Sequence, residues 1–430
     1  MKDCAYLASA VEAGRFDACL SALYGAEGVK SARQRALGVI EGFVRSYGNS
    51  SGAVLVSGPG RTELGGNHTD HQHGHVLCAS VDLDLLACAA PNGSAVIRVC
   101  SEGYPPFTVD LDILEPRPEE RNTSAGLVRG MAAGLRKLGL PVGGMDLYAV
   151  SQVPAGSGLS SSAAYEILLG AAMRSLFPAA GTEPDAVALA KLGQHAENVY
   201  FGKPCGLMDQ MGAAVGGAVA IDFADPADPA VEKLEYDFSR SGHALCIVDS
   251  GSSHDDLTED YAAVTREMCA VAAYFGKTVL RQVPEADFRA ALGTLRQDCG
   301  DRAVLRARHF YAEDRRAVRE AEALRLGDFD RFLALVNDSG LSSVCDLQNI
   351  WSPAHPEQQA VSLALSLARE LLEGTGAARV HGGGFAGTIQ AFVPEARLDK
   401  FKAGMEAVLG AGRCHVLNIR PVGGCVLWED

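Results

Sequence analysis

The sequence lacks closely spaced cysteines. Its twelve cysteines are scattered over 430 residues, and no two are closer than Cys78 and Cys88. A zinc ribbon needs Cys-x-x-Cys pairs and a disulfide framework needs many cysteines in a short chain, so neither is expected. Scattered cysteines are typical of a reducing compartment, and we therefore expect a cytoplasmic location.

Basic residues are also few, with 38 lysines and arginines against 53 acidic residues and a formal charge of −15. Nucleic acids and anionic membranes select basic surfaces, so this balance argues against both as partners. No apolar run approaches transmembrane length, and the N-terminal segment reaches Glu12 and Arg15 too soon to form a signal peptide. The chain is nevertheless 47% hydrophobic, enough for a large core and for roughly two or three domains.

One glycine-rich loop, residues 153–164, reads V-P-A-G-S-G-L-S-S-S-A-A. It is not a Walker A motif, because no Gly-Lys-Ser or Gly-Lys-Thr follows these glycines. The alternating residues 145–150 before it predict a strand, and residues 165–176 after it predict a helix. Such a turn directs backbone N–H groups and the positive end of the helix dipole at one point, which favours a phosphate. The alternative interpretation is an ordinary helix capped by serine.

A second unusual segment, residues 58–75, contains five glycines, one arginine, two acids and four histidines. Its imidazoles raise the hypothesis of a transition-metal site, although Gly74 interrupts the strand that would align them. Recognition of a polar small molecule is the alternative, with Asp70 accepting hydroxyl groups beside Asn67 and His68. The histidines concerned are His68, His71, His73 and His75.

The remaining pattern predicts three parts: a helical N-terminal extension (1–40), an N-terminal domain that holds the phosphate loop (41–222) and a C-terminal domain (223–430). Apolar spacing predicts helices within 1–47 and, farther along, at 124–138, 184–200, 256–275, 285–297, 303–325, 356–373 and 398–409. Strands are predicted at 53–57, 107–111, 218–222, 243–249, 389–393, 414–419 and 424–427, and a hairpin at 76–99 that turns at 91–93.

Glycine-rich segments near residues 60, 157 and 384 resemble, in the same order, the three motifs of the GHMP small-molecule kinases, and most closely those of galactokinases. Gly60-Arg61 and residues 66–70 are similar to the first motif, and residues 153–163 to the phosphate loop. Residues 194–197, 205–210, 306–309 and 382–387 also resemble the family. The resemblance runs from about residue 40 to the end of the sequence.

This resemblance implies an α/β (α+β) fold of two domains with the active site in the cleft between them. It implies transfer of the γ-phosphoryl group of ATP to the anomeric C1 hydroxyl of galactose, with Mg²⁺ held by Ser162 and Glu197 and with Asp209 and Arg61 as catalytic residues. The ATP phosphates would be bound by Pro154, Gly156, Ser157, Gly158, Leu159, Ser160, Ser161 and Ser162. The sugar would be bound by Asn67, His68, Asp70, Gly206, Asp209 and Tyr261.

The sequence departs from the family pattern at Asn67, which replaces an acid that contacts the sugar, and the segment around Tyr261 matches only loosely. Two alternatives stay open: a kinase of another sugar, such as N-acetylgalactosamine or a pentose, and a non-catalytic galactose sensor on the same fold. The serines of the loop, Glu197, Arg61 and Asp209 are all present, which favours a kinase. The role of residues 1–40, the oligomeric state and the choice between Asp209 as base or as positioning group are left open.

Overall fold

The structure is a computed structural model that describes residues 2–154, 157–179, 184–252 and 257–429. Within these residues, eight strands form a large sheet in the order β12-β1-β2-β5-β3-β4, with β6 paired to β2 and β7 to β6. All its pairs are antiparallel except β3 with β5. The strands are β1 (Val54–Gly65), β2 (His75–Pro91), β3 (Val96–Ser101), β4 (Phe107–Asp110), β5 (Met145–Ser151), β6 (Ala218–Asp222), β7 (Ala230–Leu234) and β12 (Cys425–Val426).

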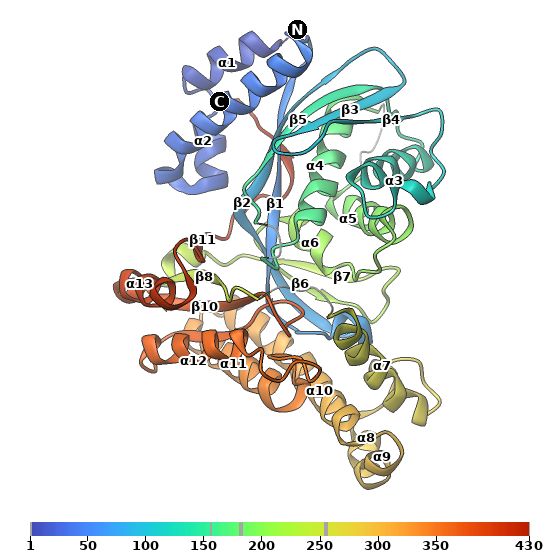
Figure 1. Ribbon diagram of the computed structural model, residues 1–430, viewed down its shortest axis with the longest axis vertical. Helices are drawn as coiled ribbons and strands as arrows, with labels where there is room; N and C mark the ends of the chain where they lie inside the picture. The colour runs from blue at the N-terminus through green and yellow to red at the C-terminus, as the bar shows by residue number, and fades with distance from the viewer. Residues whose placement is uncertain (1, 155–156, 180–183, 253–256, 430) are drawn as a thin grey trace.

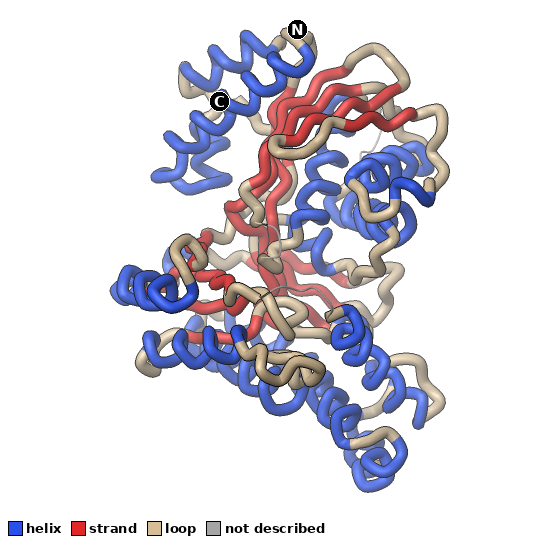
Figure 2. Tube along the Cα trace, viewed as in Figure 1, coloured by secondary structure: helices blue, strands red, loops and turns tan. Residues whose placement is uncertain are grey.

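Helices cover both faces of the upper part of this sheet (Figures 1 and 2). One face carries α3 (Ser124–Lys137), α4 (Ser161–Leu176), α5 (Ala186–His195) and α6 (Met208–Val215). The other face carries α1 (Cys4–Glu12) and α2 (Asp17–Tyr47), which share a separate apolar core with the sheet. Helices at 1–47 are therefore confirmed.

The lower part of the molecule contains a four-stranded antiparallel sheet in the order β11-β8-β10-β9 and most of the later helices. Its strands are β8 (His243–Asp249), β9 (Ala377–Val380), β10 (Thr388–Pro394) and β11 (Cys414–Leu417). The helices are α7 (Thr258–Tyr274), α8 (Glu285–Ala290), α9 (Leu292–Asp298), α10 (Asp301–Arg325), α11 (Phe329–Ser342), α12 (Ala360–Leu372) and α13 (Leu398–Leu409). No helix in the described part of the chain is long and apolar enough to cross a membrane.

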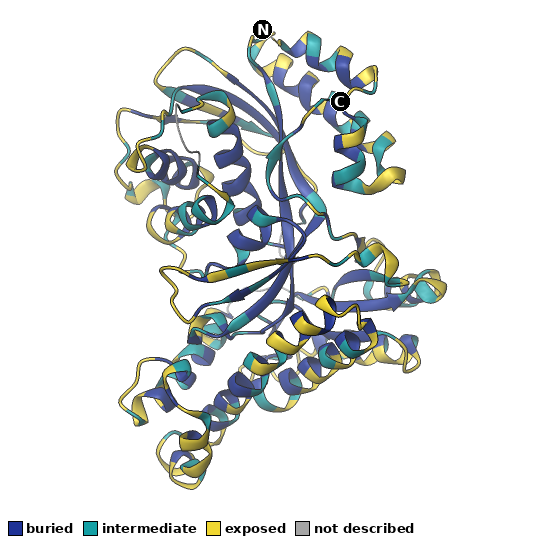
Figure 3. Ribbon diagram, turned by 180° about the vertical axis from the view of Figure 1, so that it is seen from behind, coloured by how far each residue is buried: buried dark blue, intermediate teal, exposed yellow. Residues whose placement is uncertain are grey.

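The strand β1 is longer than the predicted strand at 53–57, because it continues through the glycines up to Gly65. Nearly all of β1 and β2 is buried, as Figure 3 shows, since helices or the lower half cover both faces. Gly58 is required by this packing: a Cβ atom there would lie 2.2 Å from the backbone oxygen of Ala164 in α4. Gly58 therefore allows close approach of α4 to the strand.

The hairpin predicted at 76–99 is wrong. Strand β5 lies between β2 and β3 and pairs with both. The connection between them is held open by the segment that leads into β5, where Asn92 N donates to Gly144 O (3.0 Å) and Gly144 N donates to Ser94 O (2.9 Å). Arg98 in β3 also forms a bidentate pair with Asp146 in β5, at 2.6 Å for each bond. Local turn signals could not reveal that β5, which comes about 50 residues farther along the chain, is inserted between these two strands.

Most other predicted elements are confirmed, and β6, β8 and α13 match the predicted bounds. The sequence analysis missed α11, β7 and β9. The predicted domain boundary near residue 222 stays a prediction. Beyond that residue, β7 and β12 still pair within the large sheet, so the chain returns to its first half at its end.

A buried cluster of charged side chains lies where β1, β9 and α10 meet. Arg379 bonds the carboxylate of Glu63 and donates to Leu64 O (3.1 Å), while Glu313 accepts from Ser339 Oγ (2.6 Å). Glu320 is also fully buried, but neither of its carboxylate oxygens has a hydrogen-bond partner among the described residues. Burial, and then the charge of Glu313, raises the pKa of Glu320 well above its usual value. Burial and the charge of Glu313 therefore both favour the protonated form of Glu320.

We expect Glu320→Gln to stabilise the protein at high pH. An acid with a raised folded-state pKa binds its proton in the native state but loses it in the unfolded state above about pH 4.5. Wild-type stability therefore falls as the pH rises through this window, by at most about 1.4 kcal/mol per pH unit, and the amide removes that loss. Urea unfolding at pH 5 and pH 8 measures the difference.

The matched control is Glu322→Gln, because Glu322 lies on the same helix, is exposed and pairs with Arg331. It should change the free energy of unfolding little at either pH. If Glu320→Gln gave the same change at pH 5 and pH 8, Glu320 would be ionised in the folded protein.

Candidate active site

The phosphate loop connects β5 to the N-terminus of α4. Gly158 (φ 70°) and Ser160 (φ 58°) both adopt left-handed backbone conformations just before the helix begins at Ser161. The loop is tied to β1, because Arg61 N donates to Leu159 O (3.0 Å). The first N–H groups of an α-helix have no partner within it, so this position suits an anion. Gly156, one of the predicted phosphate contacts, lies outside the described residues.

Ser162 and Glu197, the predicted Mg²⁺ ligands, are brought together by the fold. Ser162 Oγ in α4 donates to Glu197 Oε1 (2.9 Å), and Glu197 is buried. Glu197 lies in a π-helical turn, Ala196–Phe201, that continues α5; such turns occur frequently at functional sites. A carboxylate and a hydroxyl beside a helix N-terminus are the oxygen ligands that Mg²⁺ prefers, so these residues fit the ion.

Gln210 connects this pair to a further acid that the sequence analysis did not select. Its Nε2 donates to Glu197 Oε2 (2.9 Å) and to Glu166 Oε2 (3.0 Å). Burial, and then the charge of Glu197, raises the pKa of Glu166 well above its usual value. The spacing could have indicated Glu166, because it lies one helical turn after Ser162 in the predicted helix.

Arg61 and Asp209 form a largely buried ion pair. Arg61 Nε donates to Asp209 Oδ1 (2.8 Å), Nη2 lies 2.7 Å from the same oxygen, and Nη1 bonds the carbonyl of Gly158 in the phosphate loop. Burial acts to raise the pKa of Asp209, but the charge of Arg61 outweighs it, with help from the hydroxyl of Ser160, and holds the pKa below its usual value. Asp209 is therefore ionised, and it lies in the first turn of α6.

Asp70 and Gly206, two predicted sugar contacts, lie against each other. A Cβ atom at Gly206 would be 2.2 Å from Asp70 Oδ2, so only glycine allows the carboxylate this position. Both residues line a polar hollow of about 260 Å³. The other residues around it are His71, His73, Gln194, Leu207, Phe223 and Pro226.

His68 and Tyr261 both contact the third glycine-rich loop. His68 Nε2 lies 2.9 Å from Gly383 O, and the Tyr261 hydroxyl donates to Gly384 O (2.8 Å). The first and third motifs are therefore in contact, although His68 and Gly383 are 315 residues apart in the sequence. His75 instead bonds Asp314 (2.9 Å), so His68 and His75 have separate partners. Among the described residues, no group of three or more His, Cys, Asp or Glu side chains could hold a metal ion.

Asn67 has its amide bonded to protein groups, and its exposed fraction is only 1%. Its Nδ2 donates to Glu63 Oε1 (3.0 Å) and Gly382 O (2.7 Å), and its Oδ1 accepts from Asn349 Nδ2 (3.0 Å). Asn67 thus bridges β1 to the third glycine-rich loop, and its contact with a sugar stays a prediction. Asn349 was missed because no local motif marks an asparagine so far from its partners.

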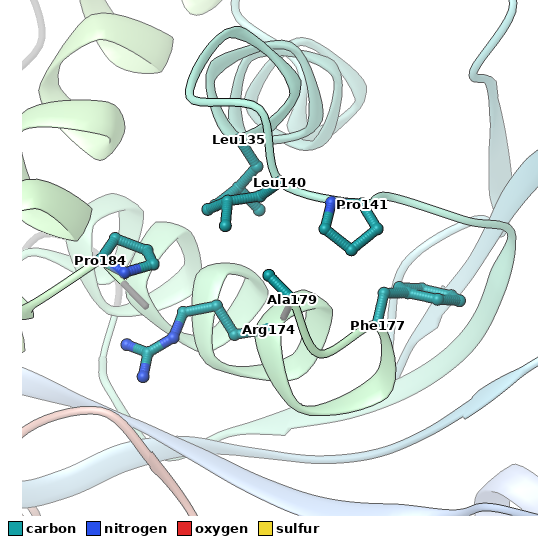
Figure 4. Close-up of a pocket in the computed structure, with 7 residues that line it drawn as sticks. All are labelled: Leu135, Leu140, Pro141, Arg174, Phe177, Ala179 and Pro184. Carbon is teal, nitrogen blue, oxygen red and sulfur yellow. The ribbon is translucent and has the colours of Figure 1, made fainter. Parts of the chain in front are cut away.

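A separate hollow between the C-terminal ends of α3 and α4 is lined mainly by apolar side chains (Figure 4). Arg174 is the only ionisable side chain among the seven described residues that line it. It lies near the far end of α4, roughly 20 Å from the phosphate loop at 1.5 Å per residue. The residues around it are Leu135, Leu140, Pro141, Arg174, Phe177, Ala179 and Pro184. We assign the active site instead to the polar groups around the phosphate loop, Arg61 and Asp209.

Comparison with known families gives two matches. Residues 41–91 match the galactokinase galactose-binding signature, and residues 126–217 match the N-terminal domain of GHMP kinases. The galactokinase of Streptomyces coelicolor (strain ATCC BAA-471 / A3(2) / M145) is 32% identical over 373 residues, which cover 86% of this chain and 92% of that protein.

Solved structures show the same fold. The structure of Lactococcus lactis galactokinase complexed with galactose has a TM-score of 0.75 at 24% identity and covers 89% of this chain and 97% of its own. Methanococcus jannaschii mevalonate kinase has a TM-score of 0.62 at 15% identity and covers 86% and 99%. The expected α/β GHMP kinase fold is confirmed by these likenesses. With a curated relative at this identity over most of both proteins, the chain belongs to the galactokinase family of the GHMP kinases.

Proposed function

We propose that this protein is an ATP-dependent kinase that transfers the γ-phosphoryl group to the C1 hydroxyl of galactose. The observation that carries the proposal is the Arg61–Asp209 pair, which lies against the phosphate loop through the bond from Arg61 to Gly158 O. Sugar and phosphate donor would meet at this pair. A kinase of another sugar and a non-catalytic sensor find no comparable support, since the matched relative is a galactokinase.

The phosphate loop and the start of α4 would hold ATP, the co-substrate of the family. The predicted contacts within the described residues are Pro154, Ser157, Gly158, Leu159, Ser160, Ser161 and Ser162. Mg²⁺ would be held by Ser162 and Glu197 and, when bound, would neutralise charge on the β- and γ-phosphates. Glu197 Oε2 is already fixed by Gln210, so Oε1, which accepts from Ser162 and lies 3.6 Å from Lys203 Nζ, would be the carboxylate oxygen that holds the ion together with the Ser162 hydroxyl.

Arg61 and Asp209 would act on the reacting groups. Asp209 is ionised, so it can accept or orient the proton of the attacking hydroxyl. Arg61 is permanently charged and can stabilise the charge that develops on the transferring phosphoryl group. His68, Asp70, Gly206 and Tyr261 would surround the sugar. All twelve cysteines are free, which supports the cytoplasm as the location.

We expect Asp209→Asn to lower kcat by roughly 10² or more, while Kd for ATP and for galactose stays within about one order of magnitude. The substitution keeps the shape of the side chain but removes its charge and its ability to accept a proton. Steady-state kinetics and calorimetry measure the two effects. Asp222→Asn is the control, because Asp222 pairs with His75 and Arg281 outside the catalytic pair. A variant with near-normal kcat would remove Asp209 from the catalytic role.

Glu197→Gln and Ser162→Ala should each raise the Mg²⁺ concentration needed for half-maximal activity, because the hard cation loses a charged oxygen ligand in the first variant and a hydroxyl ligand in the second. Mg²⁺ titration at saturating ATP measures the shift. The exposed acid Glu322 offers a control, Glu322→Gln, which should titrate like the wild type. Unchanged titrations in both site variants would leave the ion with water and phosphate ligands alone. Activity that survives a transition-metal chelator with excess Mg²⁺ would show that the four histidines hold no essential ion.

Asn67→Glu is expected to destabilise the protein unless Glu63 is changed with it. A carboxylate at position 67 would replace the amide that now donates to Glu63 Oε1 at 3.0 Å, so two buried acids would face each other. Adding Glu63→Gln restores a donor opposite the new carboxylate, and Glu63→Gln alone is measured as well, because it also removes the charge that pairs with Arg379. The coupling between the two changes should be about 0.5–3 kcal/mol in urea unfolding. kcat/KM for galactose, 6-deoxygalactose and N-acetylgalactosamine in the same variants tests sugar choice, and additive effects would mean that the two side chains do not interact.

A further inference from the structure

Residues 1–40 lie outside both matched family domains, and the structure places residues 2–40 against the large sheet. Helix α1 and the first half of α2 pack on the face opposite α4, with Leu20 and Leu23 buried against Leu55 and Leu86. This apolar contact explains why the helices are folded. It does not by itself connect the helices to the phosphate loop. That connection is made by polar side chains of α2.

A buried carboxylate in β2, Asp84, gathers three separate parts of the chain. The hydroxyl of Tyr24 in α2 donates to Asp84 Oδ2 (2.6 Å), and Arg35, also in α2, bonds Oδ1. Ser57 in β1 bonds Oδ2 as well, and Arg420, between β11 and β12, lies 3.4 Å from it. Asp84 is fully buried, so its charge must be compensated by these neighbours. Helix α2 thus supplies one of the two positive charges, those of Arg35 and Arg420, that balance the charge of Asp84.

Arg35 also reaches the residue that precedes the phosphate loop. Its Nη1 donates to the side-chain oxygen of Gln152, while the backbone N of Gln152 donates to Asp84 O (2.8 Å). Gln152 is followed directly by Val153 and Pro154, the first residues of the loop. The entry to the loop is therefore held at two points, by the backbone of β2 and by a side chain of α2.

The guanidinium group of Arg35 is fixed on three sides. Nη1 bonds Gln152, Nη2 bonds Asp84, and the group lies over the ring of Tyr24 at 5.3 Å from its centroid. A planar guanidinium group held in this way keeps Gln152 and Asp84 at a fixed distance and orientation, which the flexible side chain of a lysine does poorly. Gln152 itself is exposed, so its bond to Arg35 adds little to stability and matters mainly for orientation.

We propose that Arg35 is a positioning residue through which the N-terminal extension holds the start of the phosphate loop in its ATP-binding conformation. The inference rests on the proposed function only in assigning ATP to that loop. It gives residues 1–40 a role in nucleotide affinity and none in sugar recognition, because Tyr24, Arg35 and Gln152 touch none of the predicted sugar contacts.

Two variants test the proposal without unpairing Asp84 from all its cations. Gln152→Leu removes only the link between Arg35 and the loop. Arg35→Lys keeps a positive charge near Asp84 but cannot bond both partners in one plane. Each should raise Kd and KM for ATP about three- to tenfold, the scale of one hydrogen bond, while KM for galactose and Tm stay near the wild-type values.

Arg33→Met is the matched control, because Arg33 lies in the same helix and pairs with Asp17 within the extension. It should leave ATP affinity unchanged. Kd for ATP is measured by calorimetry with no sugar present, so the result does not depend on which sugar is phosphorylated. Unchanged Kd for ATP in both test variants would overturn the proposal and leave the extension with a stabilising role alone. Failure of the wild type to phosphorylate galactose, with ATP binding affected as expected, would instead overturn the proposed function.

Discussion

A buried charge needs a partner of opposite charge. In the candidate active site, the Arg61–Asp209 pair meets this requirement and connects β1, α6 and the phosphate loop. Arg61 belongs to β1, Asp209 to α6, and the same guanidinium bonds Gly158 in the phosphate loop. If β1 or α6 moved away, a charge inside the protein would be left unpaired, at a cost of several kcal/mol. If the loop moved, Arg61 would lose its bond to the carbonyl of Gly158. The pair therefore fixes the loop, Asp209 and the central strand relative to one another before any ligand binds.

The strand β1 carries two further connections of the same kind. Ser57, near its start, belongs to the cluster around Asp84, and Glu63, near its end, bonds Arg379 of the lower sheet. Between them lies Arg61. Three polar clusters are thus arranged along one strand, and each brings in a chain segment that is remote in sequence. Gly58 allows α4 to approach the backbone of β1, and Gly65 allows the carboxylate of Glu320 in α10 to do the same.

Much of the site could be predicted from the sequence because each motif is local. The contacts of Ser162 with Glu197 and of Arg61 with Asp209 join residues that the resemblance placed in one site, while their roles in binding Mg²⁺ and in catalysis stay predictions. The hairpin at 76–99 was wrong because β5 enters between its strands, which turn residues cannot reveal. The surroundings of Asn67 were beyond prediction for a similar reason: its partners Gly382 and Asn349 reach it only through tertiary packing.

The position of β12 has a consequence for how the chain folds during synthesis. Val426 pairs with Val56, so β1 keeps an open edge on that side until the last strand has left the ribosome. Arg420, the second cation beside Asp84, arrives equally late. During translation the extension would therefore be the first to neutralise Asp84, through Arg35. Contacts between the two ends of a chain form slowly and leave strand edges exposed to aggregation, so early helices that already cover this region would protect the nascent sheet.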